Sequence, residues 1–250
     1  MPSNRPKDGP SLRTATLFAT THWSVVLAAG HGGSTSASEA LSELCRTYWY
    51  PLYAYARRTG SSPEDAQDLT QGFFEHLLGS RLLTSADASK GRFRSFLLRS
   101  FCNYGVSKHT RAARQKRGGG QTILSLDVAG AETKFAGDLS DTHNPEVLYE
   151  RNWAGAVLEE AMLQVERQFA ASGRGRHFKV LRPLLQNDEA KGAHAAAAKE
   201  LSTTEATVRV MVHRLRRRYR EVLNEVVLRT VDSPNEVEEE LRHLLEAVQA

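Results

Sequence analysis

Apolar residues recur at intervals of three and four positions through most of this chain of 250 residues. Between residues 38 and 58 they stand at Leu41, Leu44, Cys45, Tyr48, Leu52 and Tyr55. This spacing matches one face of an α-helix, whereas a half-buried strand would alternate apolar and polar residues. A short β-like segment at residues 122–126 is the exception, and no stretch is rich in strands. We therefore predict an all-α fold.

Serine, asparagine and proline mark where several predicted helices begin. Ser62-Pro63 and Asn144-Pro145 each supply an N-cap followed by a proline in the first turn, and acidic residues follow both. Pro51 lies inside the helix predicted for residues 38–58 and predicts a kink or a break there. Further helices are expected at about 92–114, 146–170, 175–187, 193–201 and 204–228, and again after Ser233-Pro234.

Polar and glycine-rich stretches divide the predicted helices into groups. Gly118-Gly119-Gly120 ends the first half, and scattered Gly, Asp, Ser and Thr residues follow it up to residue 145. We predict two small helical domains joined by a flexible linker. The segments are a partly disordered N-terminal arm at 1–40, a domain at 41–117, the linker at 118–145, a domain at 146–228 and an acidic tail at 229–250.

Composition limits the cellular setting. Cys45 and Cys102 are far apart and form no CxxC pair, which suits a reducing compartment and argues against a cysteine-based zinc site. The N-terminus has no apolar signal core, and no apolar run approaches the roughly 20 residues that span a bilayer. We expect a cytoplasmic protein with no membrane insertion, no metal and no other cofactor.

Charge is segregated along the chain, although the net charge is only +4. Residues 90–117 and 206–220 are rich in Lys and Arg and contain no acid, whereas residues 61–80 and the tail are acidic. Close like charges on a helix cost a few tenths of a kcal/mol per pair, roughly, so two purely basic helices favour an anionic partner such as nucleic acid. Charge complementarity also suggests that the tail covers the basic helices in cis.

Residues 194–215 show the spacing of a helix-turn-helix. An alanine-rich helix leads to the turn Ser202-Thr203-Thr204, and either threonine can cap the next helix. That helix has a core stripe of Val208, Met211, Val212, Leu215 and Tyr219. The opposite face carries Ala206, Val210, His213 and Arg217, flanked by Arg209, Arg216 and Arg220, as in a DNA recognition helix. The predicted DNA contacts are Thr204, Glu205, Thr207, Arg209, His213, Arg214 and Arg217.

The helix expected from residue 92 combines cations with aromatic residues. Phe93, Leu97, Phe101 and Tyr104 form an apolar face, and Phe96 lies beside a line of basic and polar residues. An aromatic ring beside arginines can stack on an unpaired base, a contact worth about 1–3 kcal/mol, although a core position explains Phe96 equally well. The predicted DNA contacts here are Arg92, Phe96, Arg99, Asn103, Lys108, Arg111 and Arg114.

Three segments in order resemble the sigma factors of bacterial RNA polymerase, of the extracytoplasmic-function group. Asp65-Ala66-Gln67-Asp68-Leu69-Thr70-Gln71-Gly72-Phe73-Phe74 is similar to the helix that docks on the clamp of the largest polymerase subunit. Phe93-Arg94-Ser95-Phe96-Leu97, with Asn103 and a basic run after it, is similar to the segment that opens and reads the minus-ten element. The helix-turn-helix is similar to the domain that reads the minus-thirty-five element.

The resemblance implies specific partners and roles. Residues 41–117 would correspond to sigma region 2 and residues 146–228 to sigma region 4, and the loop at 79–91 would hold a base flipped out of the duplex. Core RNA polymerase, through its clamp and flap regions, and promoter DNA are the expected partners, with an anti-sigma factor or other regulator left open. The expected polymerase-binding residues are Asp65, Asp68, Gln71 and Phe74.

Other classes of protein remain as alternatives. A helix-turn-helix regulator would bind DNA without joining the polymerase, and an anti-sigma or adaptor protein would bind sigma or polymerase but not promoter DNA. The sequence contains no GxxxxGK[ST], HExxH or GxSxG motif and no cluster of metal ligands. We therefore expect that the protein is not an enzyme.

Overall fold

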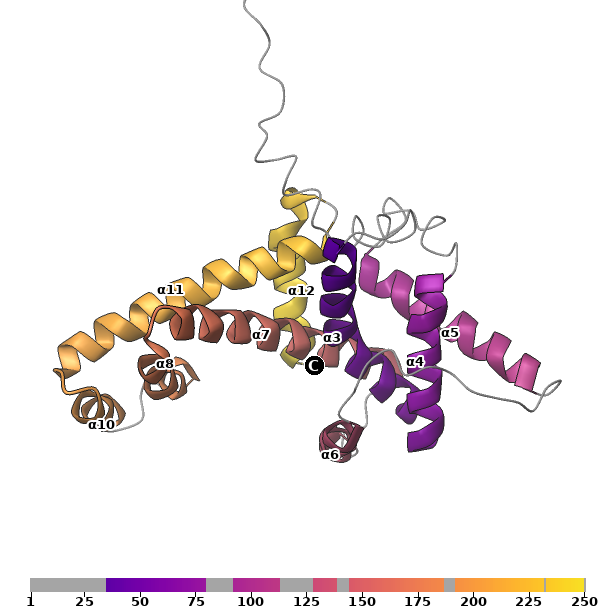
Figure 1. Ribbon diagram of the computed structural model, residues 1–250, viewed down its shortest axis with the longest axis horizontal. Coiled ribbons are helices and arrows are strands. Elements are labelled where there is room, and N and C mark those ends of the chain that lie inside the picture. Colours follow the sequence, from indigo (N-terminus) through magenta and orange to yellow (C-terminus); the bar gives the residue numbers. More distant parts are fainter. Residues whose placement is uncertain are drawn as a thin grey trace, which may run out of the picture. The chain divides into compact units, whose positions relative to one another are not determined.

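The computed structural model describes residues 35–79, 92–112, 128–138, 144–186, 192–231 and 233–249. All regular structure within these ranges is helical, which confirms the all-α prediction (Figure 1). The N-terminal arm up to residue 34, the loop at 80–91, the β-like segment at 122–126 and Arg114 lie outside the described residues. Within the same ranges, no helix has both the length and the apolar character that crossing a bilayer requires.

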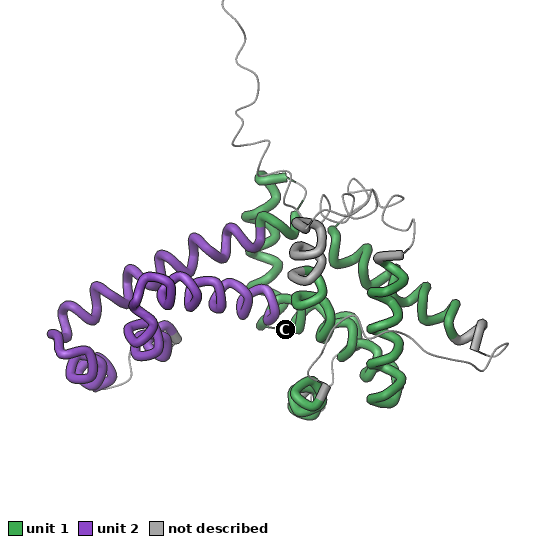
Figure 2. Tube along the Cα trace, viewed as in Figure 1, with its two compact units in different colours: residues 1–154, 228–250 green, residues 155–227 purple. Residues whose placement is uncertain are grey.

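The chain divides into two compact units, which Figure 2 distinguishes by colour. Unit 1 comprises Met1–Ala154 and Leu228–Ala250, and unit 2 comprises Gly155–Val227. These boundaries differ from the expected domains at 41–117 and 146–228. The first boundary falls inside a long helix, and the acidic tail is part of unit 1.

Unit 1 is built from helices at both ends of the chain. They are α3 (Thr35–Arg58), α4 (Pro63–Gly79), α5 (Phe93–Ala112), α6 (Val128–Asp138), the first part of α7 (Pro145–Ala171), the 3-10 turn η2 (Pro234–Glu236) and α12 (Val237–Gln249). The predicted N-caps are confirmed, because Ser62 Oγ accepts from Asp65 N at 3.1 Å and Asn144 Oδ1 accepts from Val147 N at 2.8 Å. Each cap satisfies an otherwise unpaired amide at the start of its helix.

Helix α3 continues through Pro51 as one helix, so the break that the proline allowed is absent. Proline inside a helix costs about 3 kcal/mol, because it removes one backbone hydrogen bond. Tyr48, Leu52 and Tyr53 around it are fully buried. Burial of each such side chain contributes roughly 1.5–3 kcal/mol, which outweighs the cost of the proline.

The core of unit 1 draws on five helices. On α5 the predicted apolar face is confirmed, since Phe93, Leu97 and Phe101 are buried, while Tyr104 is half-buried. The other buried side chains include Tyr48, Leu52, Phe73, Leu77, Leu148, Tyr149, Trp153 and Leu244. Helix α12 therefore contributes to the same core as α3, α4, α5 and α7.

Helix α6 lies inside the segment that we predicted as a flexible linker. Its Ala131 and Phe135, one turn apart, are buried. Glu132 accepts hydrogen bonds from the Tyr53 hydroxyl and from Arg57, whose Nε and Nη2 lie 2.8 and 3.1 Å from its carboxylate. The Arg57 hydrogen bonds hold the pKa of Glu132 below its usual value, although partial burial opposes them. Residues 128–138 are therefore an ordered part of unit 1.

Unit 2 contains the rest of α7 together with α8 (Gly175–Leu181), α9 (Pro183–Gln186), α10 (Ala193–Glu200) and most of α11 (Glu205–Thr230). On α11, Val208, Val212 and Leu215 of the predicted core stripe are buried, whereas Met211 and Tyr219 are half-buried. The other buried side chains of this unit include Val157, Ala161, Val165, Phe178, Leu181, Leu184, Ala197 and Ala198. The small alanines of α10 allow its backbone to lie close to neighbouring side chains.

A tight turn joins α10 to α11. Ser202, two residues after the end of α10, is in the left-handed region with φ 52°, and Thr203 N donates to Ala198 O at 2.9 Å. This pairing closes a helix C-terminus in the Schellman manner, for which glycine is the usual residue at the position of Ser202. Thr204 Oγ1 then accepts from Thr207 N at 3.2 Å, so Thr204 caps α11, as the sequence allowed.

Candidate functional site

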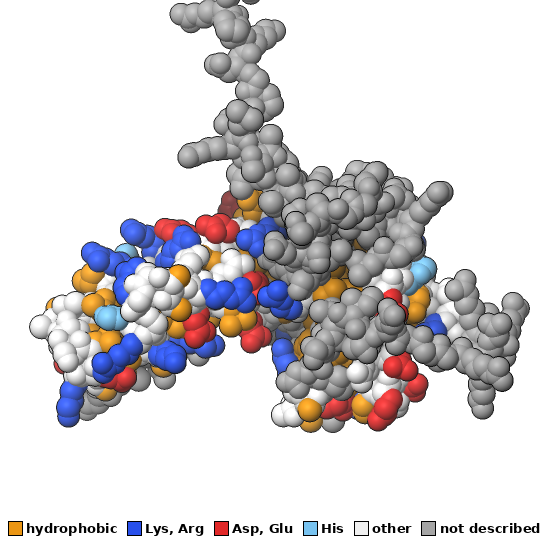
Figure 3. All heavy atoms as spheres, viewed as in Figure 1, with side chains coloured by type: hydrophobic (Ala, Val, Ile, Leu, Met, Phe, Trp, Pro, Cys, Tyr) orange, Lys and Arg blue, Asp and Glu red, His pale blue; other side chains and the backbone are white. Residues whose placement is uncertain are grey.

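The outward face of α11 carries small and basic side chains together. Its exposed residues include Ala206, Arg209, Val210, His213, Arg214 and Arg217. Arg209 and Arg217 expose 66% and 69% of their side chains. Lys and Arg side chains gather over the helices of unit 2 in Figure 3. The predicted contacts Arg209, His213, Arg214 and Arg217 thus lie on the surface.

The arginines on this face form only weak ion pairs with carboxylates of the same helix. Arg209 lies 3.6 Å from Glu205, and Arg217 lies 3.6 Å from Glu221, each pair one helical turn apart. Exposed pairs of this kind contribute about 0.3–0.5 kcal/mol. A phosphate forms shorter, charge-assisted hydrogen bonds with arginine, so it can displace such a carboxylate. Glu205 is exposed, while Thr207 is half-buried with its hydroxyl 2.9 Å from that of Thr204.

Two other arginines of α11 are directed toward the protein. Arg216, which we expected to flank the outward face, is half-buried, and its Nη2 donates to Leu184 O at 3.0 Å. Arg218 Nε donates to Gln168 Oε1 at 2.7 Å, and its Nη1 lies 3.1 Å from Glu221. These side chains hold the helices of unit 2 together, so only part of the basic charge of α11 faces outward.

The predicted contacts on α5 have different surroundings. Arg99 and Asn103 are exposed, and Phe96 is half-buried with its ring 6.1 Å from the ring of Phe93. Lys108 Nζ donates to the backbone carbonyl of Asp68 at 2.9 Å. The side chain of Arg111 and the whole of Arg114 lie outside the described residues. Among the predicted DNA contacts on α5, Arg99 and Asn103 are the ones whose described side chains are exposed.

Arg94, on the same helix, is buried and paired with two carboxylates. Its Nε lies 2.7 Å from Glu150, its Nη1 bonds to Glu240, and its guanidinium carbon lies 4.6 Å from the centre of a Trp153 ring. Burial by itself lowers the pKa of Arg94, but the two carboxylates outweigh it and raise that pKa above its ordinary value. Arg94 therefore remains charged and joins α5, α7 and α12.

Arg92 is not a free cation either, although we predicted it as a DNA contact. Its guanidinium bonds to Glu236 and lies 3.1 Å from Glu239 and 3.4 Å from Glu240. All three partners come from the acidic tail. The local sequence around Arg92 does not predict these contacts, because they join residues more than a hundred positions apart.

The buried position of Arg94 has a signal in the sequence that our prediction missed. Arg94 stands three and seven residues before Leu97 and Phe101, which places it on the buried stripe of α5. Glu240 stands in a similar relation to Leu244 and Ala247 on α12. A charge on an apolar stripe indicates a buried pair, since an isolated buried charge is costly.

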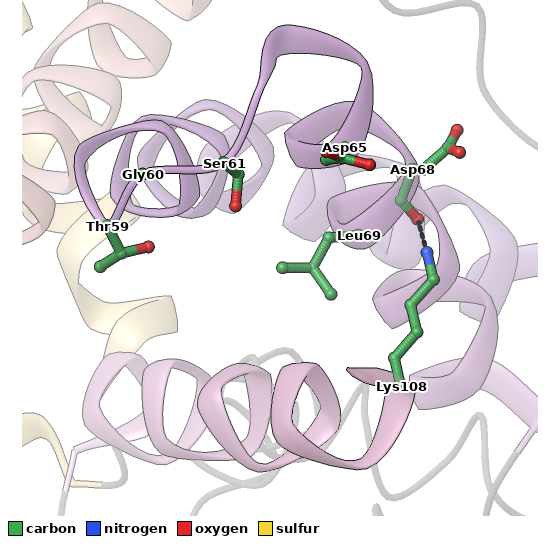
Figure 4. A pocket seen from close by; sticks show the side chains of 7 residues that line it. All are labelled: Thr59, Gly60, Ser61, Asp65, Asp68, Leu69 and Lys108. Atoms are coloured by element: carbon green, nitrogen blue, oxygen red, sulfur yellow. Dashed lines mark hydrogen bonds between the residues drawn. The ribbon is translucent and has the colours of Figure 1, made fainter. Parts of the chain in front are cut away.

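A pocket of about 410 Å³ lies beside the acidic start of α4. It is lined by Thr59, Gly60, Ser61, Asp65, Asp68, Leu69 and Lys108. Figure 4 shows Lys108 reaching from α5 to the main chain of Asp68, with Leu69 directed into the space between the helices. Asp65 and Asp68 are exposed at its edge.

The other two residues expected on this surface lie differently. Gln71 is half-buried, with its amide nitrogen 3.3 Å from a carboxylate oxygen of Glu75. Phe74 is a core residue, 4% exposed, whose ring centre lies 5.7 Å from that of Phe73. Its side chain therefore stabilises unit 1 and is not part of the pocket edge. Within the described residues, no three His, Cys, Asp or Glu side chains are grouped as ligands of one metal ion.

No protein-family model, curated protein or solved structure matches this chain. The exposed basic face of α11, the exposed Arg99 and Asn103 of α5 and the pocket beside the acidic start of α4 are the features from which a function can be inferred.

Proposed function

We propose that this protein is a sigma factor, which binds core RNA polymerase and directs it to promoter DNA. Helix α11 binds the upstream duplex, α5 binds DNA near the site of strand opening, and the acidic edge of α4 binds the polymerase. The observation that carries the proposal is the outward face of α11, where Arg209, His213 and Arg217 are exposed beside the small Ala206.

The order of small and basic residues on α11 suits a recognition helix. Ala206 and Val210 near its start leave room for close approach to a groove, and the arginines can reach bases or phosphates. The turn at Ser202 and the cap at Thr204 fix where α11 begins relative to α10. In this proposal α10, the turn and α11 act as a helix-turn-helix.

The pocket beside α4 suits a basic protein partner. Asp65 and Asp68 are exposed lining residues at its edge, and Leu69 is directed into it. Lys108 Nζ donates to the main-chain carbonyl of Asp68 at 2.9 Å. A helix carrying arginines and one apolar side chain would complement this surface in charge and in shape.

Transcription with purified core polymerase tests the proposal. The protein should confer start-site selectivity in run-off transcription on a genomic DNA library, and it should co-purify with core polymerase. Asp68→Arg should abolish co-purification, because it reverses the charge at the pocket edge. Glu64→Arg makes the same change on the same helix outside the pocket lining, so it should retain binding. Equal binding by wild type and Asp68→Arg would contradict the docking surface.

The second candidate is a helix-turn-helix regulator that does not join the polymerase. The surroundings of Arg92, directly before α5, and of Lys108 on α5 favour it. Arg92 is held by glutamates and Lys108 by a carbonyl, which leaves α11 as the more accessible basic face. Such a protein would bind specific DNA but would neither co-purify with core polymerase nor support run-off transcription.

A further inference from the structure

Carboxylates of the acidic tail surround Arg92, which directly precedes the N-terminus of α5. Each of the three guanidinium nitrogens of Arg92 faces a glutamate of the tail: Nη1 faces Glu236, Nη2 faces Glu239 and Nε faces Glu240. Arginine binds a phosphate through the same N–H groups. Three of the five N–H donors of Arg92 thus face carboxylates, and a phosphate that approaches Arg92 competes with them.

The local charge also opposes an anion at this place. Arg92 and Arg94 supply two positive charges, and Glu150, Glu236, Glu239 and Glu240 supply four negative charges, so the group has a net charge of 2 − 4 = −2. His243, whose Nε2 lies 2.9 Å from Glu150, reduces this excess only when it is protonated. A group with net negative charge repels the phosphates of nearby nucleic acid.

The contacts of the tail are of two kinds, which allows them to be separated. Glu240 and Arg94 are buried, so this pair belongs to the core of unit 1. Glu236 and Glu239 expose 38% and 71% of their side chains, and their partner Arg92 exposes 21%. Pairs near the surface contribute little stability and exchange readily with other anions. The outer pairs can therefore break while α12 remains in place.

We propose that the tail competes with nucleic acid for Arg92: Glu236 and Glu239 occupy its guanidinium where a backbone phosphate would bind. The ligand is the phosphate backbone of DNA, and the inference rests on the proposed DNA-binding function. Binding at α5 requires the release of Arg92 from η2 and α12. The tail thus lowers the affinity of unit 1 for nucleic acid without unfolding it.

The test measures binding of the full chain to a labelled mixed-sequence DNA duplex over a range of salt concentrations. Glu236→Gln combined with Glu239→Gln should increase affinity about threefold to tenfold at low salt. The salt dependence should also become steeper by about 0.9 in log–log slope, as expected for one additional phosphate contact. Adding Arg92→Gln should return both values to the level of the wild type or below.

The matched control removes the same amount of charge elsewhere in the acidic tail. Glu238 and Glu246 are exposed on α12 and form no ion pair with Arg92 or Arg94. Glu238→Gln combined with Glu246→Gln should raise affinity less and leave the salt slope unchanged. Thermal unfolding of both double variants should match the wild type, because the Arg94–Glu240 pair is intact in each.

The possible results separate competition for Arg92 from the proposed DNA-binding function. If the Glu236 and Glu239 variant binds DNA no better than the control, competition for Arg92 is excluded while the proposed DNA-binding function stands. If the wild type binds weakly and only this variant binds tightly, the inference is supported. If no variant binds duplex DNA, the proposed function and the inference both fail.

Discussion

The guanidinium of Arg94 and the carboxylate of Glu240 meet in the interior of unit 1, although 146 positions separate them in the sequence. Only 8% of the Arg94 side chain and 1% of the Glu240 side chain are exposed. The pair joins α5 to α12, the last described helix. Because it is buried, water does not screen the attraction that binds the acidic tail to unit 1.

Removing one partner of this pair should destabilise the protein strongly. Arg94→Met leaves the Glu240 carboxylate buried without its closest cation, and such a change costs about 3–5 kcal/mol. The combination Arg94→Met with Glu240→Leu should cost clearly less than the sum of the single changes, because neither charge remains. Urea unfolding of the four proteins gives the coupling free energy, and additive effects would show that the two side chains are energetically independent.

Replacing Ser202 with glycine should stabilise unit 2. The left-handed conformation at φ 52° costs a residue with a Cβ atom about 1–2 kcal/mol, whereas glycine adopts it freely. Glycine also loses more backbone entropy on folding, so we expect a net gain of about 0.5–1 kcal/mol. Thermal unfolding of Ser202→Gly measures this gain. Ser202→Ala, which keeps the Cβ atom, should show none.

DNA affinity should depend on which arginine of α11 is removed. Arg217→Ala and Arg209→Ala should each weaken binding, by about 1–3 kcal/mol where the side chain reaches a base edge. Contact with phosphate alone would lower affinity evenly across sequences and flatten the salt dependence. Arg218→Ala is the control, because that guanidinium is directed toward Gln168 and Glu221. Equal losses for all three arginines would contradict an outward recognition face.

The contribution of Glu132 to stability should disappear in acid. Arg57 lowers the pKa of Glu132 in the folded state. The folded protein therefore binds a proton at Glu132 less readily than the unfolded chain, in which a glutamate has a pKa of about 4.3. The stabilisation is complete above that unfolded pKa and is lost as pH falls through the lower folded value. Since about a third of the side chain is exposed, we expect about 1 kcal/mol or less.

Denaturation of wild type and Glu132→Gln at several pH values checks this prediction. The difference in the free energy of unfolding should be constant from neutral pH down to about pH 5 and should close below about pH 4. Glu159→Gln, at an exposed position on α7, should show no such pH-dependent difference. A gap that persists in strong acid would mean that packing, and not the ion pair, is responsible.

The two cysteines should differ in reactivity. Burial raises the pKa of the Cys45 thiol to about 12, so at pH 8 only on the order of one molecule in ten thousand carries the reactive thiolate. Cys102 is half-buried, with its sulfur 3.5 Å from the Tyr55 hydroxyl. A disulfide exchange reagent should modify one thiol per folded chain and both after denaturation. Cys102→Ser should remove the reaction of the folded protein.

Local signals predicted most of the helices, because each depends on residues close in sequence. Ser62, Asn144 and Thr204 cap helices where the pattern indicated, and the spacing of Val208, Val212 and Leu215 gave the buried side of α11. Helix α6 was not predicted, since it is short and contains Gly130 and Gly137, and its docking depends on Arg57 and Tyr53 far earlier in the chain.

The candidate site was harder to predict than the helices. The outward position of Arg209 and Arg217 follows from the period of one helix, but the engagement of Arg92 depends on where the tail packs. Arg216 is similar, because its position on the helix wheel does not show that Leu184 offers a carbonyl to it. Charge density along the sequence indicates an anion partner, but it does not show which cations the protein itself neutralises.

The division of unit 1 between two distant stretches of chain has a consequence for biosynthesis. A ribosome completes α3, α4 and α5 long before it makes α12, the last described helix. Unit 2 is continuous in sequence, and its synthesis is complete before that of α12 begins. The contacts of Trp153 with His243 and of Arg94 with Glu240 can therefore form only after α12 has been made, so the folding of unit 1 is completed late in synthesis.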